Sequence, residues 1–183
     1  MRKKSPAPPF ITSTLQQEAS KRLGFQSKRT MKAAQELYEG IDIDGLGAVG
    51  LITYMRTDSL RISNDAMNEA RGFIASTYGA AYLPASPRHY KSKKNIQDAH
   101  EAIRPTMAGL KPERVKPNFT SDQYKLYKLI WERFIASQMA NALLSTSSVD
   151  IEANGYIFKS SGYSVKFDGF TKLYEEGRDD NDT

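Results

Sequence analysis

The hydrophobic pattern of this chain changes near residue 140, and the change limits which folds are open to it. From Thr120 to about Met139, apolar and aromatic side chains recur at helical spacing, which predicts a long amphipathic helix. Three later stretches are rich in β-favouring residues: 144–152, 156–160 and 164–167. The pair Asn154-Gly155 between the first two is typical of a tight hairpin turn. The sequence therefore predicts a mainly α-helical fold with a small β part.

Four further helices are expected before residue 106, at residues 14–23, 28–39, 64–78 and 96–103. The signals that limit them are a capping box, two stop glycines, an N-cap serine and a proline: Ser13 with Gln16, Gly24 and Gly40, Ser63, and Pro105. Residues 41–50 hold three glycines, which predicts a flexible loop or hairpin between the second and third helices.

The first two helices are joined by a short link, so they are expected to form a helix-turn-helix-like unit. Lys28, Arg29 and Lys32, at the start of the second helix, could contact nucleic-acid phosphates. The alternative is an ordinary helical hairpin with a solvated basic face. The aromatic stripe at residues 127–135 also has two interpretations, because such a stripe can stack bases but more often forms core.

Composition sets modest bounds. The chain has 183 residues, enough for one good core, and 26 basic against 21 acidic residues give a net charge of +5 that mildly favours an anionic partner. Without cysteine, neither disulfides nor thiolate metal sites can form, which suits the cytosol. No apolar run is long enough for a membrane span, and the basic start leads into prolines instead of a signal peptide. We expect a soluble, intracellular protein.

The stretch GLITYMRTDS, residues 50–59, gathers a tyrosine, a permanent cation and several small polar groups. Residues 51–55 favour a short strand, on which Tyr54 and Arg56 would share a face. A phenol with a pKa of about 10 is almost wholly protonated at neutral pH, so a nucleophilic tyrosine needs a neighbour that stabilises its anion or its target. A guanidinium can do both and matches phosphate oxygens. The pattern indicates a phosphate-handling nucleophile site.

The same stretch resembles the active-tyrosine motif of bacterial type IA DNA topoisomerases. Two more segments resemble that family in the same order: PFITSTLQ at residues 9–16 and QDAHEAIRP at residues 97–105. A weaker similarity continues through Trp131 and residues 167–170. The resemblance implies that Tyr54 attacks a backbone phosphate of single-stranded DNA and forms a transient 5′-phosphotyrosyl link.

The resemblance also implies roles for the neighbours of Tyr54. Arg56 would stabilise the phosphate charge, Thr57 and Asp58 would arrange local hydrogen bonds, and His100 and Arg104 would grip the adjacent DNA backbone. On a helix, His100 and Arg104 would lie one turn apart on one face. From the residues alone, His100 could equally be structural. A zinc-protease site is excluded because HEAIR, residues 100–104, lacks the second histidine.

The domain organisation implied by the resemblance has four parts: a flexible or extended lead-in at 1–9, a helical tyrosine domain related to winged-helix folds at 10–140, a returning β segment of a hinge domain at 141–175, and a disordered acidic tail at 176–183. Mg²⁺ would be bound by a separate toprim domain that has no counterpart here. Asp42 and Asp44 are not taken as metal ligands, because two carboxylates leave most of a magnesium shell unfilled. We expect no metal in this chain.

The implied whole enzyme is a cytoplasmic, nucleoid-associated monomer that acts on single-stranded and negatively supercoiled DNA, relaxing it without ATP. This chain resembles an excised piece of such an enzyme and is not expected to relax DNA by itself. One alternative is a winged-helix DNA-binding module without covalent chemistry, which explains the basic second helix but not the tyrosine and histidine motifs. A third possibility is that the isolated piece is only a structural hinge.

Overall fold

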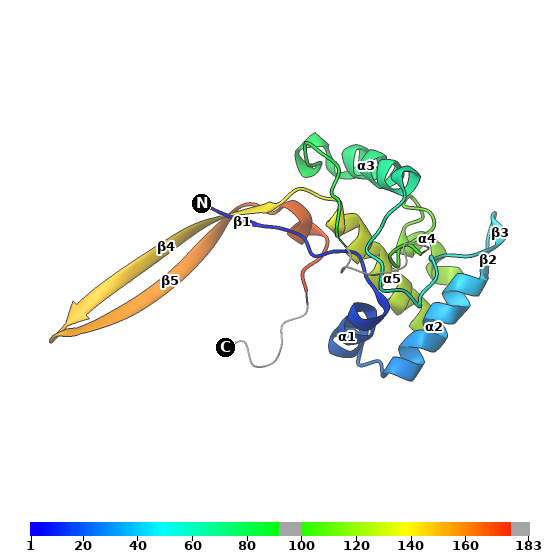
Figure 1. Cartoon of the computed structure of the whole chain (residues 1–183), viewed down its shortest axis with the longest axis horizontal. Helices are drawn as coiled ribbons and strands as arrows, with labels where there is room; N and C mark the ends of the chain where they lie inside the picture. Colours follow the sequence, from blue (N-terminus) through cyan, green and yellow to red (C-terminus); the bar gives the residue numbers. More distant parts are fainter. Residues whose placement is uncertain (92–99, 177–183) are drawn as a thin grey trace.

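The structure is a computed structural model that describes residues 1–91 and 100–176. Within these residues, five α-helices form a body from which a long β-hairpin projects (Figure 1). The helices are α1 (Thr12–Leu23), α2 (Ser27–Glu39), α3 (Asn64–Tyr78), α4 (Pro112–Val115) and α5 (Ser121–Ser137). The strands are β1 (Arg2–Lys4), β2 (Ile41–Ile43), β3 (Gly47–Val49), β4 (Ala142–Ala153) and β5 (Tyr156–Phe167). The fold is therefore mixed α/β, with a larger β part than the small one expected.

Helix α5 is the centre of the hydrophobic core. The side chains of Tyr127, Trp131 and Phe134 are each at most 4% exposed. The Tyr127 hydroxyl donates to the Leu110 carbonyl oxygen at 2.7 Å, and the Trp131 indole N–H donates to the Ala108 carbonyl oxygen at 2.9 Å. Their burial confirms that this stripe is core. Its interpretation as a base-stacking platform is wrong, because the rings are enclosed and their polar atoms are bonded inside.

Most helix limits follow the local signals in the sequence. Ser63 caps α3 by accepting from the Ala66 N–H, and Gly24 ends α1 in the left-handed region with φ of 65°. The capping box of Ser13 and Gln16 is wrong, because α1 begins earlier and the Ile11 N–H donates to the Thr14 hydroxyl at 3.0 Å. After α2, the glycine-rich stretch forms the antiparallel hairpin β2–β3.

Two predicted elements do not form in the described residues. Residues 51–55 are no strand, since Ile52 makes only an isolated bridge to Pro105. Residues 100–103, the described part of the helix predicted at 96–103, are not helical, and residues 96–99 lie outside the described ranges. The two segments bond to each other instead: the Thr53 N–H donates to the Arg104 carbonyl oxygen and the Thr106 N–H to that of Leu51, both at 2.9 Å. The N–H groups of Ala102 and Ile103, which a helix would pair internally, donate instead to the Arg61 and Phe10 carbonyl oxygens, both at 2.8 Å.

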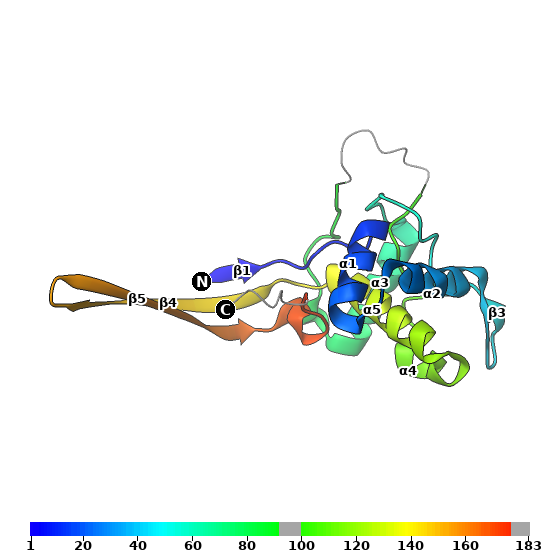
Figure 2. The same ribbon diagram turned by 90° about the horizontal axis from the view of Figure 1, so that it is seen from below.

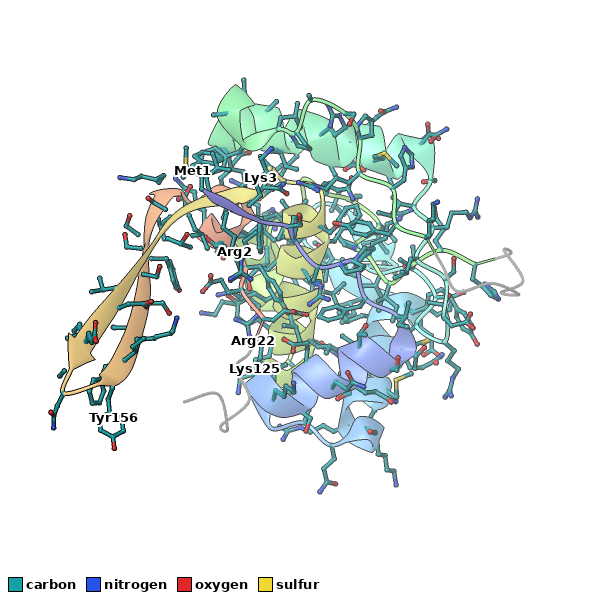
Figure 3. All side chains as sticks on the ribbon, turned by 60° about the vertical axis from the view of Figure 1, so that its left-hand side comes forward. Met1, Arg2, Lys3, Arg22, Lys125 and Tyr156 are labelled. Atoms are coloured by element: carbon teal, nitrogen blue, oxygen red, sulfur yellow. The ribbon has the colours of Figure 1, made fainter. Side chains whose placement is uncertain are left out.

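Strands β4 and β5 form a ribbon that leaves the body. The pairing runs from Leu143↔Phe167 to Ala153↔Tyr156 and is continuous through residues 161–163, which the sequence pattern left as a gap. The predicted turn is confirmed, because Asn154 and Gly155 both have positive φ, 52° and 80°, as a two-residue hairpin requires. Tyr156 at the tip points away from the helical body (Figure 3).

Both ends of the described chain are fastened to α5. The Arg133 guanidinium, 4% exposed, donates from Nε to the Pro8 carbonyl oxygen at 2.5 Å and from Nη1 to the Tyr174 hydroxyl and Glu176 carboxylate at 3.2 and 3.0 Å. Burial raises the pKa of Tyr174 to about 12. Figure 2 shows β1 lying beside the base of the ribbon, where it pairs with β4. The expected lead-in thus contains an ordered strand, while the domain boundaries stay predictions and residues 177–183 of the predicted acidic tail lie outside the described chain.

Candidate active site

Residues 51–59 follow α2 and β3 across the body, held by backbone bonds on two sides. On one side are the bonds to residues 104–106 described above. On the other, the Thr12 N–H donates to the Thr57 carbonyl oxygen at 2.9 Å, and the Thr12 hydroxyl donates to the Met55 carbonyl oxygen at 2.8 Å. Thr12 also accepts from the Thr57 N–H at 2.8 Å. The start of α1, within the first family-like motif, therefore fixes the path of the second.

Side chains alternate along the end of this segment. Met55, Thr57 and Ser59 are buried, whereas Arg56 and Asp58 are exposed. Although no strand forms, burial over residues 55–59 keeps the period of two that the sequence indicated. Within the described residues, the Arg56 guanidinium makes no hydrogen bond or ion pair, so it is available to a ligand at the surface.

The Tyr54 ring is half-buried between two other rings. The centroid of Tyr38, from the end of α2, lies 5.4 Å from that of Tyr54, with an edge-on angle of 66° between the rings. The centroid of the His100 ring lies 5.3 Å from that of Tyr54, and the planes of the two rings are inclined at 39°. The predicted helical face shared by His100 and Arg104 does not exist, but His100 still reaches the tyrosine. The structure thus brings together residues from α2, the tyrosine segment and the third family-like motif.

Arg104 has a different environment from His100. Its guanidinium is 11% exposed, pairs with the Glu101 carboxylate at 2.6 Å and donates to the Pro105 carbonyl oxygen at 3.0 Å. The other Glu101 oxygen accepts from the Ser63 N–H, where α3 begins. Among the described residues, the buried Arg104 Nε finds no hydrogen-bond partner. Arg104 is therefore paired inside the histidine motif, and it is its partner Glu101 that joins this motif to the start of α3.

Thr57 and Asp58 differ in the same way. Thr57 is 8% exposed, and its hydroxyl accepts from the Ser59 N–H at 3.1 Å. Together with its bonds to Thr12, this contact makes Thr57 a support for the local backbone. Asp58 is exposed beside Arg56 on the outer side of the segment. Of the two, only Asp58 is free to face a ligand.

The three basic residues at the start of α2 are not equivalent. Arg29 binds Asp122 of α5 through two hydrogen bonds of 2.7 Å and lies over the Phe25 ring. This hydrogen bond lowers the pKa of the Asp122 carboxyl below its ordinary value. Lys28 and Lys32 make no such pair within the described part of the chain. Arg29 therefore fastens two helices, while the lysines remain available to an anion.

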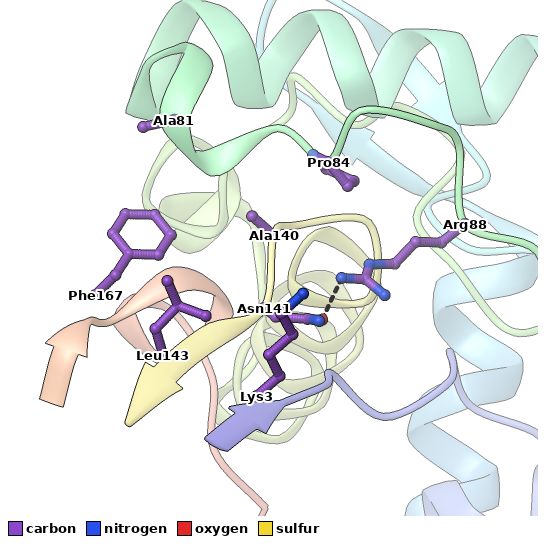
Figure 4. A pocket seen from close by; sticks show the side chains of 8 residues that line it. All are labelled: Lys3, Ala81, Pro84, Arg88, Ala140, Asn141, Leu143 and Phe167. Carbon is purple, nitrogen blue, oxygen red and sulfur yellow. Dashed lines mark hydrogen bonds between the residues drawn. The ribbon is translucent and has the colours of Figure 1, made fainter. Parts of the chain in front are cut away.

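A separate cavity of about 460 Å³ lies at the base of the ribbon (Figure 4). Its basic lining residues are Lys3 and Arg88, and Arg88 is held by the Met139 carbonyl oxygen and the Asn141 side chain. None of the residues around Tyr54 lines it. This cavity belongs to the junction between ribbon and body, not to the tyrosine site.

The described residues contain no group of three or more histidine, cysteine, aspartate or glutamate side chains arranged to hold a metal ion. In residues 1–91 and 100–176, no helix has the length and hydrophobicity needed to cross a membrane.

Sequence reasoning missed three residues that shape the site. Thr12 and Glu101 lie inside the family-like motifs, so the motifs could have drawn attention to them. Tyr38, near the end of α2, is 41% exposed, and its ring contacts that of Tyr54. No spacing rule links residues 38 and 54, because the contact depends on how the chain returns after the β2–β3 hairpin.

Comparison with known proteins shows the family of this chain. The family model described as DNA topoisomerase matches residues 1–183. DNA topoisomerase 1 from two strains of Xylella fastidiosa, Temecula1 and 9a5c, is 53% identical over 180 residues, which is 97% of this chain and 22% of each relative. The full-length topoisomerase I structure from Thermotoga maritima matches with a TM-score of 0.83 and 40% identity, over 100% of this chain and 29% of that one. The chain thus spans about a fifth of its curated relatives' length, and it belongs to the bacterial type IA DNA topoisomerase family.

Proposed function

We propose that this chain supplies the nucleophile for reversible cleavage of single-stranded DNA in a type IA topoisomerase. The observation that carries the proposal is the position of Tyr54, whose half-buried ring contacts the rings of Tyr38 and His100. Arg56, two residues further on, is exposed and makes no ion pair within the described residues. Three motifs distant in sequence converge there, as expected if they serve one reaction.

In the proposed step, the Tyr54 oxygen bonds to a backbone phosphorus and the bond from phosphorus to the 3′-oxygen breaks. The Tyr54 hydroxyl gives up its proton and the leaving 3′-oxygen takes one up, so the 5′-phosphate stays on the tyrosine and no net proton is consumed. Because the new ester keeps the energy of the broken one, the 3′-hydroxyl can reverse the reaction without ATP. Arg56 stabilises the charge that grows on the phosphate oxygens. His100 holds the nucleophile's ring and faces the adjacent DNA backbone.

Other parts of the proposal lie outside this chain. Following the family resemblance, the proposal assigns Mg²⁺ to a toprim domain elsewhere in the enzyme. Residues 141–175 would complete a hinge domain, and 10–140 would form the winged-helix-related tyrosine domain. The whole enzyme would be a cytoplasmic, nucleoid-associated monomer that binds single-stranded DNA and relaxes negative supercoils. This chain alone would not relax supercoiled DNA.

The test is adduct formation by the full-length enzyme with and without the Tyr54 hydroxyl. Tyr54→Phe should abolish the covalent complex with a labelled oligonucleotide on a denaturing gel run after incubation with Mg²⁺, while non-covalent affinity stays nearly unchanged. Tyr163→Phe, on the ribbon, is the matched control and should form adduct like the parent. If the Tyr54→Phe enzyme still forms adduct, the nucleophile is a residue other than Tyr54. If the parent forms none but binds duplex DNA sequence-specifically, the non-catalytic winged-helix function replaces this one.

A further inference from the structure

Tyr38 is attached to the tyrosine segment through its backbone as well as its ring. The Leu51 N–H donates to the Leu37 carbonyl oxygen at 2.8 Å, so the last turn of α2 hydrogen-bonds the start of the segment. At Gly50 the two backbones are so close that an added Cβ would lie 2.9 Å from the Tyr38 carbonyl oxygen. The positions of Tyr38 and Tyr54 relative to each other are therefore set by the main chain.

The two rings that contact Tyr54 come from segments far apart in the sequence, and both restrict the rotation of its side chain. Tyr38 comes from a helix packed on α5, and His100 comes from the segment bonded to Thr53. A tyrosine side chain has two rotatable torsions before its ring is fixed, and each neighbouring ring removes part of that freedom. Aromatic rings also prefer edge-on contacts such as that of Tyr38 on Tyr54. The arrangement limits the directions in which the Tyr54 hydroxyl can point.

Tyr38 is too exposed for this contact to be explained by core packing. It is 41% exposed, whereas its neighbour Leu37 is fully buried and anchors α2. An exposed tyrosine at a helix end contributes little to the burial of apolar surface. Its ring contacts that of Tyr54, so removal should affect the orientation of the Tyr54 ring more than the stability of the fold.

We propose that Tyr38 is a positioning residue that holds the Tyr54 ring in the orientation required for attack on the DNA phosphate. The inference rests on the proposed function of Tyr54. Tyr38 touches the nucleophile and not the DNA. Reactions that depend on a pre-oriented nucleophile lose rate when the reacting atom is displaced, by as much as about a hundredfold for a displacement of about 1 Å.

The experiment measures single-turnover cleavage of a saturating labelled oligonucleotide by the full-length enzyme, together with the Kd of the same oligonucleotide by fluorescence anisotropy. Tyr38→Ala should slow cleavage by about tenfold to a hundredfold and leave Kd within about twofold. Tyr38→Phe should restore the rate, because the contact is made by the ring and not the hydroxyl. Tyr163→Ala, which removes an exposed tyrosine from the ribbon, should cleave like the parent.

Thermal unfolding of each variant separates positioning from folding. Tyr38→Leu keeps apolar bulk on α2 without a ring, so it should unfold like the parent yet cleave as slowly as Tyr38→Ala. The inference is overturned if Tyr38→Ala or Tyr38→Leu cleaves at the parent rate, if Tyr38→Phe is as slow as Tyr38→Ala, or if the whole effect lies in Kd, as base stacking on Tyr38 would give. Tyr54→Phe, measured alongside, tests the proposed function separately. If this variant still forms adduct, both the proposed function and the role of Tyr38 are wrong. If it forms none, the proposed function stands and the Tyr38 variants alone decide the positioning role.

Discussion

Arg56 and Arg104 carry the same charge, but they differ in exposure and in whether an acidic partner neutralises them. Arg56 is exposed beside Tyr54 and makes no ion pair within the described residues, so its charge can go wholly to a phosphate. Arg104 is 11% exposed and already neutralised by Glu101. Glu101 in turn accepts from the Ser63 N–H at the start of α3, and removing one partner of such a desolvated pair leaves the other charge buried.

Arg56→Ala in the full-length enzyme should slow cleavage about a hundredfold or more. This corresponds to a loss of a few kcal/mol of transition-state stabilisation, by analogy with loss of an oxyanion-hole donor. The reason is that the charge growing on the phosphate loses its nearest cation. Single-turnover kinetics at saturating DNA measure the effect. Arg61→Ala, an exposed arginine on the same stretch, is the control. Equal slowing of both variants would show that Arg56 acts only as one of several general charges.

Glu132 on α5 provides a test of the buried electrostatics. Burial raises the pKa of its carboxyl above the ordinary value of 4.5, against the opposing effect of Lys128. Because the folded pKa is raised, the unfolded chain loses this proton first, and stability falls as pH rises from the ordinary value through the folded one. Glu132→Gln should therefore unfold at a higher temperature than the parent at pH 7 and lose that advantage below about pH 4. Calorimetry across this range checks it, and a variant less stable at pH 7 would contradict it.

The sequence predicted single residues best where the physics is local. The Ser63 cap and the Gly24 stop depend only on their own helix ends, and both are confirmed. The pairing of His100 with Tyr54 came from family resemblance, since the helix inferred from residue spacing is wrong over its described part. Tyr38 could not have been placed, because its contact requires the packing of α2 against a returning loop.

Helix α2 joins the core and the candidate site. Leu37 is buried, Arg29 is bonded to α5 and Tyr38 contacts Tyr54. The tyrosine segment itself was predicted as a strand because its residues favour β structure. That prediction failed because a strand needs a neighbour with free backbone groups along its length, and here residues 103–106 provide only a few.

Since Arg29 is occupied by Asp122, the DNA contacts predicted for the start of α2 should come mainly from Lys28 and Lys32. Each lysine that meets a phosphate contributes about 0.7 to the slope of log K against log salt for single-stranded DNA. Lys28→Ala and Lys32→Ala should each make the slope shallower by about that amount, and Arg29→Ala should change it less. Anisotropy titrations at several salt concentrations measure the slopes. A larger change for Arg29→Ala would mean that the Asp122 pair opens on DNA.

The whole molecule has two parts that differ in how they are stabilised. The helical body encloses a core around α5, whereas both faces of the distal ribbon meet solvent. Several large apolar side chains there are more than half exposed: Val149, Ile151, Tyr156, Ile157, Phe158, Tyr163 and Val165. Such a surface suits the proposal that the ribbon is part of a hinge domain completed by other residues of the enzyme.

Hydrogen exchange on this chain should therefore be graded. Backbone amides in α5 should exchange slowest because they open only with the core, and amides of the distal ribbon, residues 147–160, should exchange fastest among the strands. Leu143 and Leu144, paired on both sides by β1 and β5, are expected to lie between these limits. Exchange rates by mass spectrometry give the profile. Ribbon amides as protected as those of α5 would show that the ribbon is stabilised in a way that this fold does not provide.

The identity of the nucleophile is best tested by mapping the covalent adduct. The full-length enzyme is trapped on an oligonucleotide, digested with nuclease and trypsin, and sequenced by tandem mass spectrometry. Trypsin leaves one peptide, residues 33–56, that contains both Tyr38 and Tyr54, so fragment ions must separate the two. The account predicts a nucleotide phosphate on Tyr54 alone, unchanged when Tyr38→Phe removes the other hydroxyl. A phosphate on Tyr38, or on any peptide outside this stretch, would contradict it.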